Sequence, residues 1–468
     1  MAVLSTVPSL QSFSELLAWV RSALDATPTA RLLSLSLPLP PLDPLVAWGV
    51  LGSSRDRHYY QERPATQEAI VAVGPAALLE LNGPQRFQQA QTFINACLTQ
   101  GLRLQAEGAT LGPSFCCSFS FFEDVTAAAP TVAPATVFLP RWQVRCQADR
   151  SVLTASFAIA DREGYRQRLE EVWQVYRHLQ AIAPQPFQLP PLRPNRWIEQ
   201  QASDPQVFRA GVETVLAEIA AGRLHKGVLA RCLEATAESA IVPEGVLDRL
   251  RQRFADCAIF SCGDGRGSVF LGATPERLAA VESGQLVTEA LAGSAPRGET
   301  AAADQALGQA LQANPKELQE HQLVAQFIRQ TLNDLGLEPR LSDRPQLRRL
   351  SNIQHLHTPI AAPLPADLPL LDVVAQLHPT PAVAGLPKQA AEQAIRRLEP
   401  FERSLYAAPV GWVDDQGNGE FLVGIRSALI QGNRVRLCAG AGIVPGSQPD
   451  RELIEVDLKL QAMLGALI

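Results

Sequence analysis

The chain has 468 residues, 46% of them hydrophobic, so it can bury a large core and form two or three domains or one unusually large one. Its formal net charge is -6 at pH 7 and it has no long run of Lys or Arg, which excludes a nucleic-acid-binding surface and favours a small-molecule partner. The N-terminus lacks a signal-peptide pattern and no segment is as long as a membrane span, so we expect a cytoplasmic protein with no membrane partner.

The cysteines are scattered without a CxxC pair or the spacing of a zinc finger. This pattern favours reduced and mostly buried thiols. Adjacent Cys116 and Cys117 fall in an alternating segment, where they would point to opposite faces of a strand. A metal site shared by these two residues is therefore not expected.

The N-terminal part of the chain concentrates no catalytic residue types. Its periodicity predicts helices at residues 13–25, 87–100 and 162–183 and strands at 45–51, 69–73, 113–124 and 137–144. The proline-dense connector PQPFQLPPLRPNRW then ends near Trp197. We place the main boundary there, between an N-terminal portion (1–190) and a catalytic portion (195–468) against which it packs.

The second half contains more hairpins than helices. Its pattern predicts helices at 203–222 and 302–335, a strand at 225–237, hairpins turning at GDGRG, ESGQ and DDQGNGE, and a turn-rich run at 364–387. Frequent hairpins predict an α+β fold with an antiparallel core.

Four glutamates form two pairs with i,i+3 spacing on separate predicted helices, Glu317 with Glu320 and Glu452 with Glu455. If the helices face each other, the carboxylates could hold Mg²⁺ together with several waters. Lys459 lies four residues after Glu455 on the same helical face. The alternative is a pair of solvated helix faces with a Glu455–Lys459 ion pair, and the spacing alone favours it.

Three other charged residues lie in apolar or tight segments. Lys226, in a strand of small and apolar residues, either reaches the surface or is desolvated and acts as a general base. Glu276, in the segment TPER, either pairs with Arg277 or is a general acid kept protonated by burial. Arg426, in the middle of the strand-like FLVGIRSALI, needs an anionic partner such as a bound carboxylate.

The second half contains a series of distinctive motifs, in chain order KGVLAR, GATPERL, ALAGSAPRG, KELQEHQLV, QHLHTPI, LHPTPAVAG, FERSLYAAPVGW, GIRSALI and AGAGIVPGSQPDRELIEVDLKLQAML. Together they resemble the motifs of the chorismate-utilising enzymes, most closely isochorismate synthases. The match covers about residues 195–468. The resemblance implies one large α/β structure whose antiparallel sheets enclose the active site, with helices outside, and a monomeric enzyme.

The resemblance also implies roles for residues that match the family's motifs. Glu320 and Glu455 match the glutamates that bind Mg²⁺ directly, and Glu317 and Glu452 match the outer pair that holds its waters. The ion in turn would bind one carboxylate of chorismate. The positions that match substrate-binding groups are Gly293, Ser294, His355, Tyr406, Arg426, the backbone of Gly440, and Lys459, which is expected to turn toward the substrate instead of pairing with Glu455.

The reaction implied is the isomerisation of chorismate to isochorismate for menaquinone or phylloquinone synthesis. Lys226 would deprotonate a water that attacks C2, while Glu276 protonates the departing C4 hydroxyl. Family members that add ammonia generally lack this lysine, and position 292 is alanine where aminodeoxychorismate synthases carry a nucleophilic lysine.

Three alternatives remain. A salicylate synthase would add pyruvate elimination, although such enzymes usually have threonine at the position of Ala382. An isochorismate synthase of a siderophore pathway would make the same product. A catalytically silent binding subunit is disfavoured, because it has no chemical need for Lys226, Glu276 and both metal carboxylates together.

Overall fold

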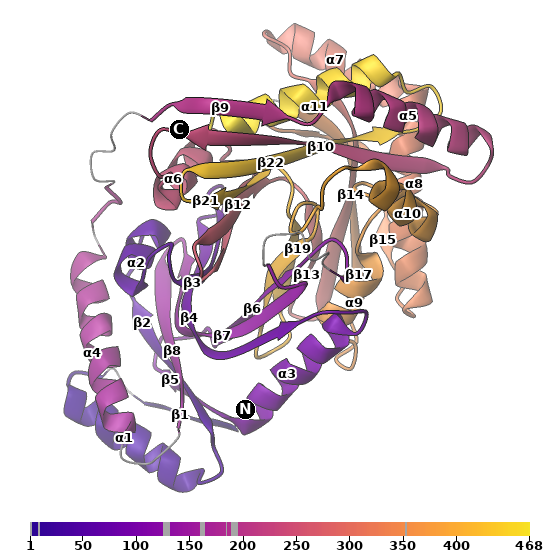
Figure 1. Ribbon diagram of the computed structural model, residues 1–468. Helices are drawn as coiled ribbons and strands as arrows, with labels where there is room; N and C mark the ends of the chain where they lie inside the picture. Colours follow the sequence, from indigo (N-terminus) through magenta and orange to yellow (C-terminus); the bar gives the residue numbers. More distant parts are fainter. Residues whose placement is uncertain are drawn as a thin grey trace.

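The computed structural model describes residues 2–7, 10–124, 132–159, 164–183, 185–188, 195–351 and 353–468. In these residues the strands form one continuous 22-stranded sheet, with helices on its outer faces (Figure 1). The sheet branches at β7 (Ala135–Gln147), which pairs with β4 along one edge and with β6 and β8 along the other. Three ladders of strands therefore leave β7.

The first ladder leads to the strand that begins with Lys226. Its strands, in spatial order, are β4 (Glu68–Leu81), β3 (Arg57–Arg63), β11 (Ala258–Asp264), β12 (Ser268–Thr274), β21 (Ser427–Gln431), β22 (Arg434–Ile443) and β10 (Lys226–Ala237), with β9 (Trp197–Ala202) and β18 (Gly385–Leu386) along the far edge of β10.

The second ladder leads to the strand that carries the ALAGS motif. Its strands, in spatial order, are β6 (Ser114–Phe119), β19 (Pro409–Asp414), β20 (Gly419–Val423), β13 (Arg277–Glu282), β14 (Gln285–Pro296) and β17 (Ile353–Pro363), with β15 (Arg340–Leu341) and β16 (Gln346–Arg349) outermost.

The third ladder contains β8 (Arg150–Ala158), β2 (Leu32–Leu39), β5 (Gly101–Ala106) and β1 (Ala2–Val7). The pairings of β5 with β2 and with β1 are parallel, whereas the other described pairings are antiparallel. The predicted fold class, a mixed structure with a large antiparallel sheet, is therefore confirmed.

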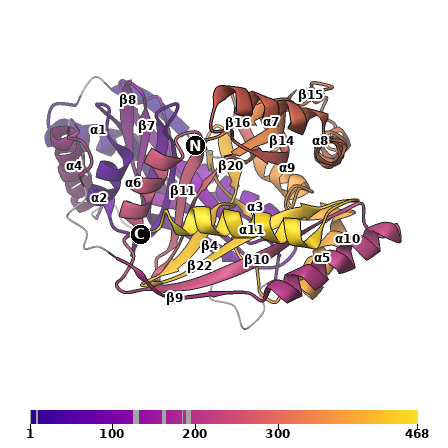
Figure 2. The same cartoon turned by 90° about the horizontal axis from the view of Figure 1, so that it is seen from above.

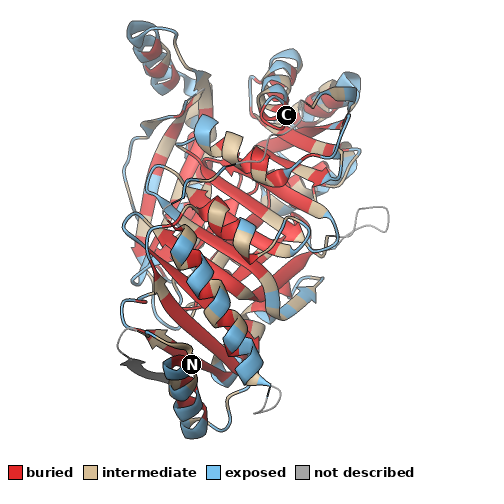
Figure 3. Ribbon diagram, turned by 90° about the vertical axis from the view of Figure 1, so that its left-hand side faces the viewer, coloured by how far each residue is buried: buried red, intermediate tan, exposed pale blue. Residues whose placement is uncertain are grey.

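Most helices are amphipathic and turn their apolar faces toward the sheet, while their outer faces are exposed (Figure 3). Their bounds are α1 (Phe13–Ala26), α2 (Pro44–Leu51), α3 (Arg86–Gln100), α4 (Tyr165–Ile182), α5 (Pro205–Ala220), α6 (Pro243–Arg253), α7 (Ala301–Ala313), α8 (Pro315–Asp334), α9 (Leu370–Leu377), α10 (Lys388–Leu398) and α11 (Pro449–Leu464). Seen from above, α11 lies across β22 and β10 beside α5 (Figure 2). Within the described ranges, no helix is long and apolar enough to cross a membrane.

The predicted division into 1–190 and 195–468 remains a prediction. Much of the proline-dense connector, residues 184 and 189–194, lies outside the described residues. Strand pairs β3–β11 and β6–β19 join the two portions into one sheet. The largest hydrophobic cluster likewise contains residues of both, from Leu16 to Leu467.

Several predicted elements differ from the structure. Residues 45–51, predicted as a strand, form helix α2, because Asp43 caps its start by accepting a hydrogen bond from Leu45 N and Pro44 occupies the first turn. The helix predicted at 302–335 is split into α7 and α8 by Asn314 and Pro315. The turn-rich run at 364–387 contains helix α9.

The prediction of wholly reduced thiols is wrong for one pair of cysteines. Cys232 on β10 and Cys438 on β22 lie directly opposite each other and form a disulfide. Their positions are 206 residues apart in the sequence, so no local spacing connects them. The other six cysteines are free, and most are buried.

Candidate active site

One pocket, with a cavity volume of about 140 Å³, lies between the ends of the first and second ladders. Strands β10 and β22 line one side, β14 and β17 line another, and helices α8 and α11 contribute side chains. Every predicted site residue except Lys226 lines this pocket, and Lys226 lies directly behind its wall. The structure thus brings together residues that the sequence spreads from position 226 to position 459.

The four glutamates lie in the first two turns of two helices. Asn314 caps α8 by accepting hydrogen bonds from the backbone of Lys316 and Glu317, which fixes the turn that carries Glu317. Helix α11 begins at Pro449 and carries Glu452 in its first turn. The positive end of each helix dipole favours the carboxylates in the first turns, Glu317 and Glu452.

Lysines pair with three of the four carboxylates. The nearest nitrogen–oxygen distances are 2.8 Å for Lys226 and Glu320, 3.0 Å for Lys316 and Glu452, and 2.7 Å for Lys459 and Glu455. Glu317 instead accepts a hydrogen bond of 3.1 Å from Ser294 N and lies 3.9 Å from Lys316. Burial and the neighbouring Glu320 raise the pKa of Glu317.

The donor set fits a hard divalent cation in its chemistry. Four carboxylates share this end of the pocket with the three lysines just named, so negative charge is in excess. Among the described residues, no group of three or more His, Cys, Asp or Glu side chains converges as a ready-made metal site. Mg²⁺ does not need one, because it usually binds one or two carboxylates and keeps several waters.

Lys226 does not reach the surface. Its side chain is fully buried, and its ammonium group forms the ion pair with Glu320. The pair depends on the absence of a side chain at Gly442, where a Cβ would lie 2.3 Å from Glu320 Oε1 and 3.2 Å from Lys226 Cε. The small residues of β22 therefore make room for the buried charges.

Glu276 is not the partner of Arg277. The Arg277 guanidinium pairs with Glu420, whereas the Glu276 side chain lines the pocket and is only 6% exposed. Burial, and then the negative charge of Glu289, raises the pKa of Glu276 to about 8. A carboxyl group with this pKa is protonated at neutral pH and can donate a proton.

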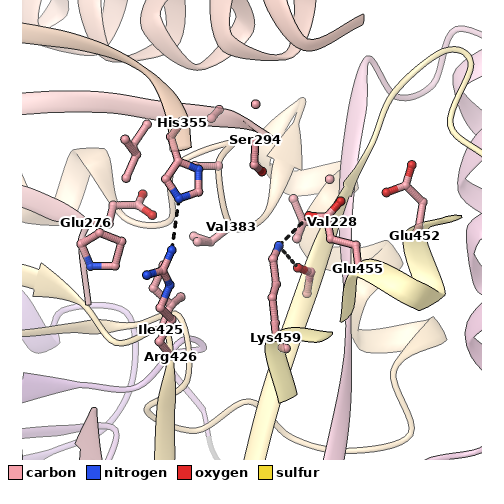
Figure 4. A pocket seen from close by; sticks show the side chains of 18 of the residues that line it. Val228, Glu276, Ser294, His355, Val383, Ile425, Arg426, Glu452, Glu455 and Lys459 are labelled. Atoms are coloured by element: carbon pink, nitrogen blue, oxygen red, sulfur yellow. Dashed lines mark hydrogen bonds and ion pairs between the residues drawn. The ribbon is translucent and has the colours of Figure 1, made fainter. Parts of the chain in front are cut away.

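The prediction that Arg426 lies within a strand is wrong, because β20 ends at Val423 and β21 begins at Ser427. Arg426 lies between them in the left-handed region, at φ 48°. Its Nη2 is 3.1 Å from His355 Nε2 and its Nη1 is 3.9 Å from Cys257 Sγ, and no carboxylate of the described chain forms an ion pair with it (Figure 4). The positive charge of Arg426 thus has no anionic partner among the described residues, as the prediction of a bound carboxylate requires.

His355 is neutral beside Arg426. Arg can only donate hydrogen bonds, so His355 Nε2 must accept from it. Burial, and then the positive charge of Arg426, lowers the pKa of His355 well below its usual value. A neutral histidine leaves the guanidinium charge available to a ligand.

Lys459 does pair with Glu455, contrary to the expectation that it turns toward a substrate (Figure 4). Its ammonium group also donates a 2.9 Å hydrogen bond to the carbonyl of Gly440. Gly440 lies close to the hydroxyl of Tyr406, since a Cβ there would be 3.2 Å from that oxygen. All three residues line the pocket, but the substrate-binding roles of these residues remain predictions.

Two charged residues near the pocket were not singled out from the sequence. Lys316 connects helix α8 to α11 through its ion pair with Glu452. Its position directly before Glu317, in the first turn of the helix, could have indicated that it lies near the acidic residues. Glu289 lies on β14 and raises the pKa of Glu276. In the sequence, only the presence of an acidic residue within an apolar strand could have indicated its role.

Known proteins match this chain over nearly its whole length. Residues 18–468 match the family model described as chorismate binding enzyme. The salicylate biosynthesis isochorismate synthase of Pseudomonas aeruginosa is 36% identical over 450 residues, which cover 93% of this chain and 90% of that protein. The isochorismate synthase MenF of Bacillus subtilis is 31% identical over 451 residues, 94% of each protein.

The fold agrees with that of solved relatives. The menaquinone-specific isochorismate synthase MenF of Escherichia coli superposes with a TM-score of 0.77 at 27% identity, covering 96% of this chain and all of that one. The resemblance found in the motifs is therefore confirmed, and the match extends over nearly the whole chain. The chain belongs to the chorismate binding enzyme family.

Proposed function

We propose that the protein is an isochorismate synthase, an isomerase that converts chorismate to isochorismate. The observation that carries the proposal is the arrangement of three groups around one pocket. A fully buried lysine, Lys226, lies behind one wall, a carboxyl group protonated at neutral pH, Glu276, lies in another, and Arg426 lacks a carboxylate partner among the described residues. Relatives named isochorismate synthase that match more than nine-tenths of the chain support the same activity.

In the proposed reaction a water oxygen forms a bond to C2 of chorismate, the ring double bonds shift, and the C4–oxygen bond breaks. Lys226, in its neutral form, takes a proton from the attacking water, and Glu276 gives its proton to the departing hydroxyl. Arg426 would bind a substrate carboxylate through its guanidinium group, whose positive charge the neutral His355 does not compensate.

We further propose that Mg²⁺ supports the reaction, with Glu320 and Glu455 as direct ligands and Glu317 and Glu452 as partners of its waters. When bound, it would supply positive charge that anchors the second carboxylate of the substrate. The crowding of four carboxylates around the beginnings of α8 and α11 supports this assignment.

The proposed product feeds menaquinone or phylloquinone synthesis. MenF relatives from three bacteria, each covering more than nine-tenths of the chain, support the menaquinone route. The relative from Pseudomonas aeruginosa serves salicylate biosynthesis, so the pathway requires a genetic test. Complementation of a bacterial strain that lacks its menaquinone-specific enzyme should restore menaquinone.

The activity itself is tested by incubating the purified protein with chorismate, in MgCl₂ and in EDTA, and by identifying the products chromatographically. We expect an equilibrium mixture of chorismate and isochorismate with MgCl₂ and none with EDTA. Stoichiometric pyruvate would show a salicylate synthase instead, and intact chorismate binding without turnover would show a silent binding protein.

A further inference from the structure

Beside the peptide that joins Glu276 to Arg277 lies a second charged cluster that the proposed reaction does not use. Glu289 on β14 is its centre, with His357 of β17 and Arg348 of β16 as partners. Alternation along the strands puts Glu289 on the same face as Leu291, and His357 on the same face as His355. Since Leu291 and His355 line the pocket, this cluster is directed toward the same side of the sheet.

We propose that Glu289 is a positioning residue for Glu276: it fixes the peptide that follows Glu276 and keeps a permanent negative charge beside it. This inference rests on the proposed function, because it concerns the group assigned there as the general acid.

The first part of the proposal is a set of backbone contacts. Glu289 Oε1 accepts a 2.9 Å hydrogen bond from Arg277 N, the peptide nitrogen directly after Glu276. Glu276 N donates to Thr274 Oγ1 at 3.2 Å, and the Glu276 carbonyl accepts from Val423 N at 3.1 Å. The peptide groups on both sides of Glu276 are thus held, and Glu289 is the only charged group among their partners in the described residues.

The second part is the charge of Glu289 itself. Its side chain is 10% exposed, and burial alone would favour the neutral acid. However, hydrogen bonds from His357 Nε2 at 2.8 Å and Arg348 Nη1 at 2.9 Å, together with the Arg277 N–H, hold the pKa of Glu289 at about 2. Because an ionised carboxylate can only accept, His357 Nε2 carries the proton in this bond.

Two buried carboxyl groups therefore have opposite protonation states at neutral pH. Glu289 is ionised, and its charge opposes ionisation of Glu276. The other charged or titratable groups that act on Glu276 are Lys226 on β10, Arg348 on β16, Arg426 between β20 and β21, and Tyr406. The cations among them favour ionisation of Glu276, and burial together with the charge of Glu289 counteracts them. Arg63 on β3 also acts on Glu289.

The test compares pH profiles of kcat/KM for two variants that change the charge in opposite directions. Glu289→Gln keeps an acceptor for Arg277 N–H but removes the negative charge, so the loss of activity at high pH should move about one pH unit lower. Arg348→Met removes a cation that favours ionisation of Glu276, so the same limb should move higher. Glu234→Gln, at an exposed carboxylate paired with Arg436, should leave the profile unchanged.

Opposite shifts would support the proposal, and unchanged limbs in folded, active variants would overturn it. A merely structural role would lower activity without moving the limb in opposite directions. If Glu289→Gln does not fold, Arg348→Met alone carries the test, because only a change of charge near Glu276 moves the limb upward.

A second readout separates this inference from the proposed activity. The infrared band of the protonated Glu276 carboxyl group, assigned by its loss in Glu276→Gln, can be titrated without chorismate. In Glu289→Gln we expect its midpoint about one pH unit below that of the unmodified protein. A wild-type protein that leaves chorismate unchanged would overturn the proposed function, whereas an unchanged band midpoint would overturn only the role of Glu289.

Discussion

The two ends of the pocket are built on different principles. At the end formed by α8 and α11, hereafter the acidic end, charged side chains project from helices and three of the four carboxylates have lysine partners. At the end formed by strands and loops around Glu276, His355 and Arg426, hereafter the arginine end, the guanidinium faces a neutral histidine and the carboxyl group is protonated at neutral pH (Figure 4).

The difference indicates how each end would work. Ion pairs at the acidic end can exchange partners, since a metal ion or a substrate can replace a lysine at a carboxylate. The arginine end is already set for an anion and a proton transfer, because burial and neighbouring charges set the protonation states of Glu276 and His355 before a ligand binds. The following changes, in order of expected effect, test this comparison.

Lys226→Ala should have the largest effect. Loss of the general base should lower kcat by about a thousandfold or more, because proton transfer by a positioned side chain typically contributes 10²–10⁴. The rate of isochorismate formation measures this effect, with circular dichroism as the check on folding. Lys226→Arg is the matched control, since it keeps a positive charge near Glu320 but a guanidinium group does not act as a base. Near-normal activity in either variant would disprove the role of Lys226 as the base.

Glu276→Gln should be the next most harmful change. It removes the proton donor and should lower kcat by about a hundredfold or more. The pH profile gives a sharper test than the rate. An acid must be protonated to act, so kcat/KM of the unmodified enzyme should fall as pH rises through about 8, the pKa of Glu276. The variant should lack this decline, and a decline that persists would assign it to another group.

Gly442→Ala tests the acidic end by adding a methyl group next to Glu320. The added Cβ would lie 2.3 Å from Glu320 Oε1, so Glu320 must move. We expect a loss of about tenfold or more in kcat/KM and a higher Mg²⁺ requirement, because misplacing a reacting group by about 1 Å is costly. Gly49→Ala is the control, since nothing lies within 4 Å of its added Cβ. An unchanged Mg²⁺ requirement in Gly442→Ala would show that Glu320 does not bind the ion.

The acidic end could be predicted from the sequence more completely than the arginine end. Glutamates three residues apart on helices share a face, so Glu317, Glu320, Glu452 and Glu455 could be grouped by local spacing, and the motifs paired the two helices. Their close approach in one pocket agrees with this prediction. The ion pair between Lys459 and Glu455 was the local alternative, and it forms in the structure.

The arginine end depends on contacts between distant strands, which local patterns do not encode. An apolar run predicted a strand through Arg426, but the backbone of Arg426 itself adopts the left-handed conformation and interrupts the strand. Glu289, His357 and Arg348 belong to three strands whose pairing fixes their contact. The disulfide between Cys232 and Cys438 arises in the same way, from the register of β10 and β22.

This disulfide gives the prediction with the smallest expected effect on turnover. It joins β10, which carries Lys226, to β22, which carries Gly440 and Gly442, and Cys438 lines the pocket. Protein unfolded without reductant should expose six reactive thiols, and reduction should raise the number to eight. Turnover should change little on reduction, because the hydrogen bonds between β10 and β22 keep the two strands in register.

The double variant Cys232→Ser, Cys438→Ser is the control and should show six thiols with or without reductant. Eight thiols in the unreduced native sequence would contradict the disulfide. A Mg²⁺ requirement that rises on reduction, while the decline above pH 8 stays in place, would show that the bond supports the acidic end alone.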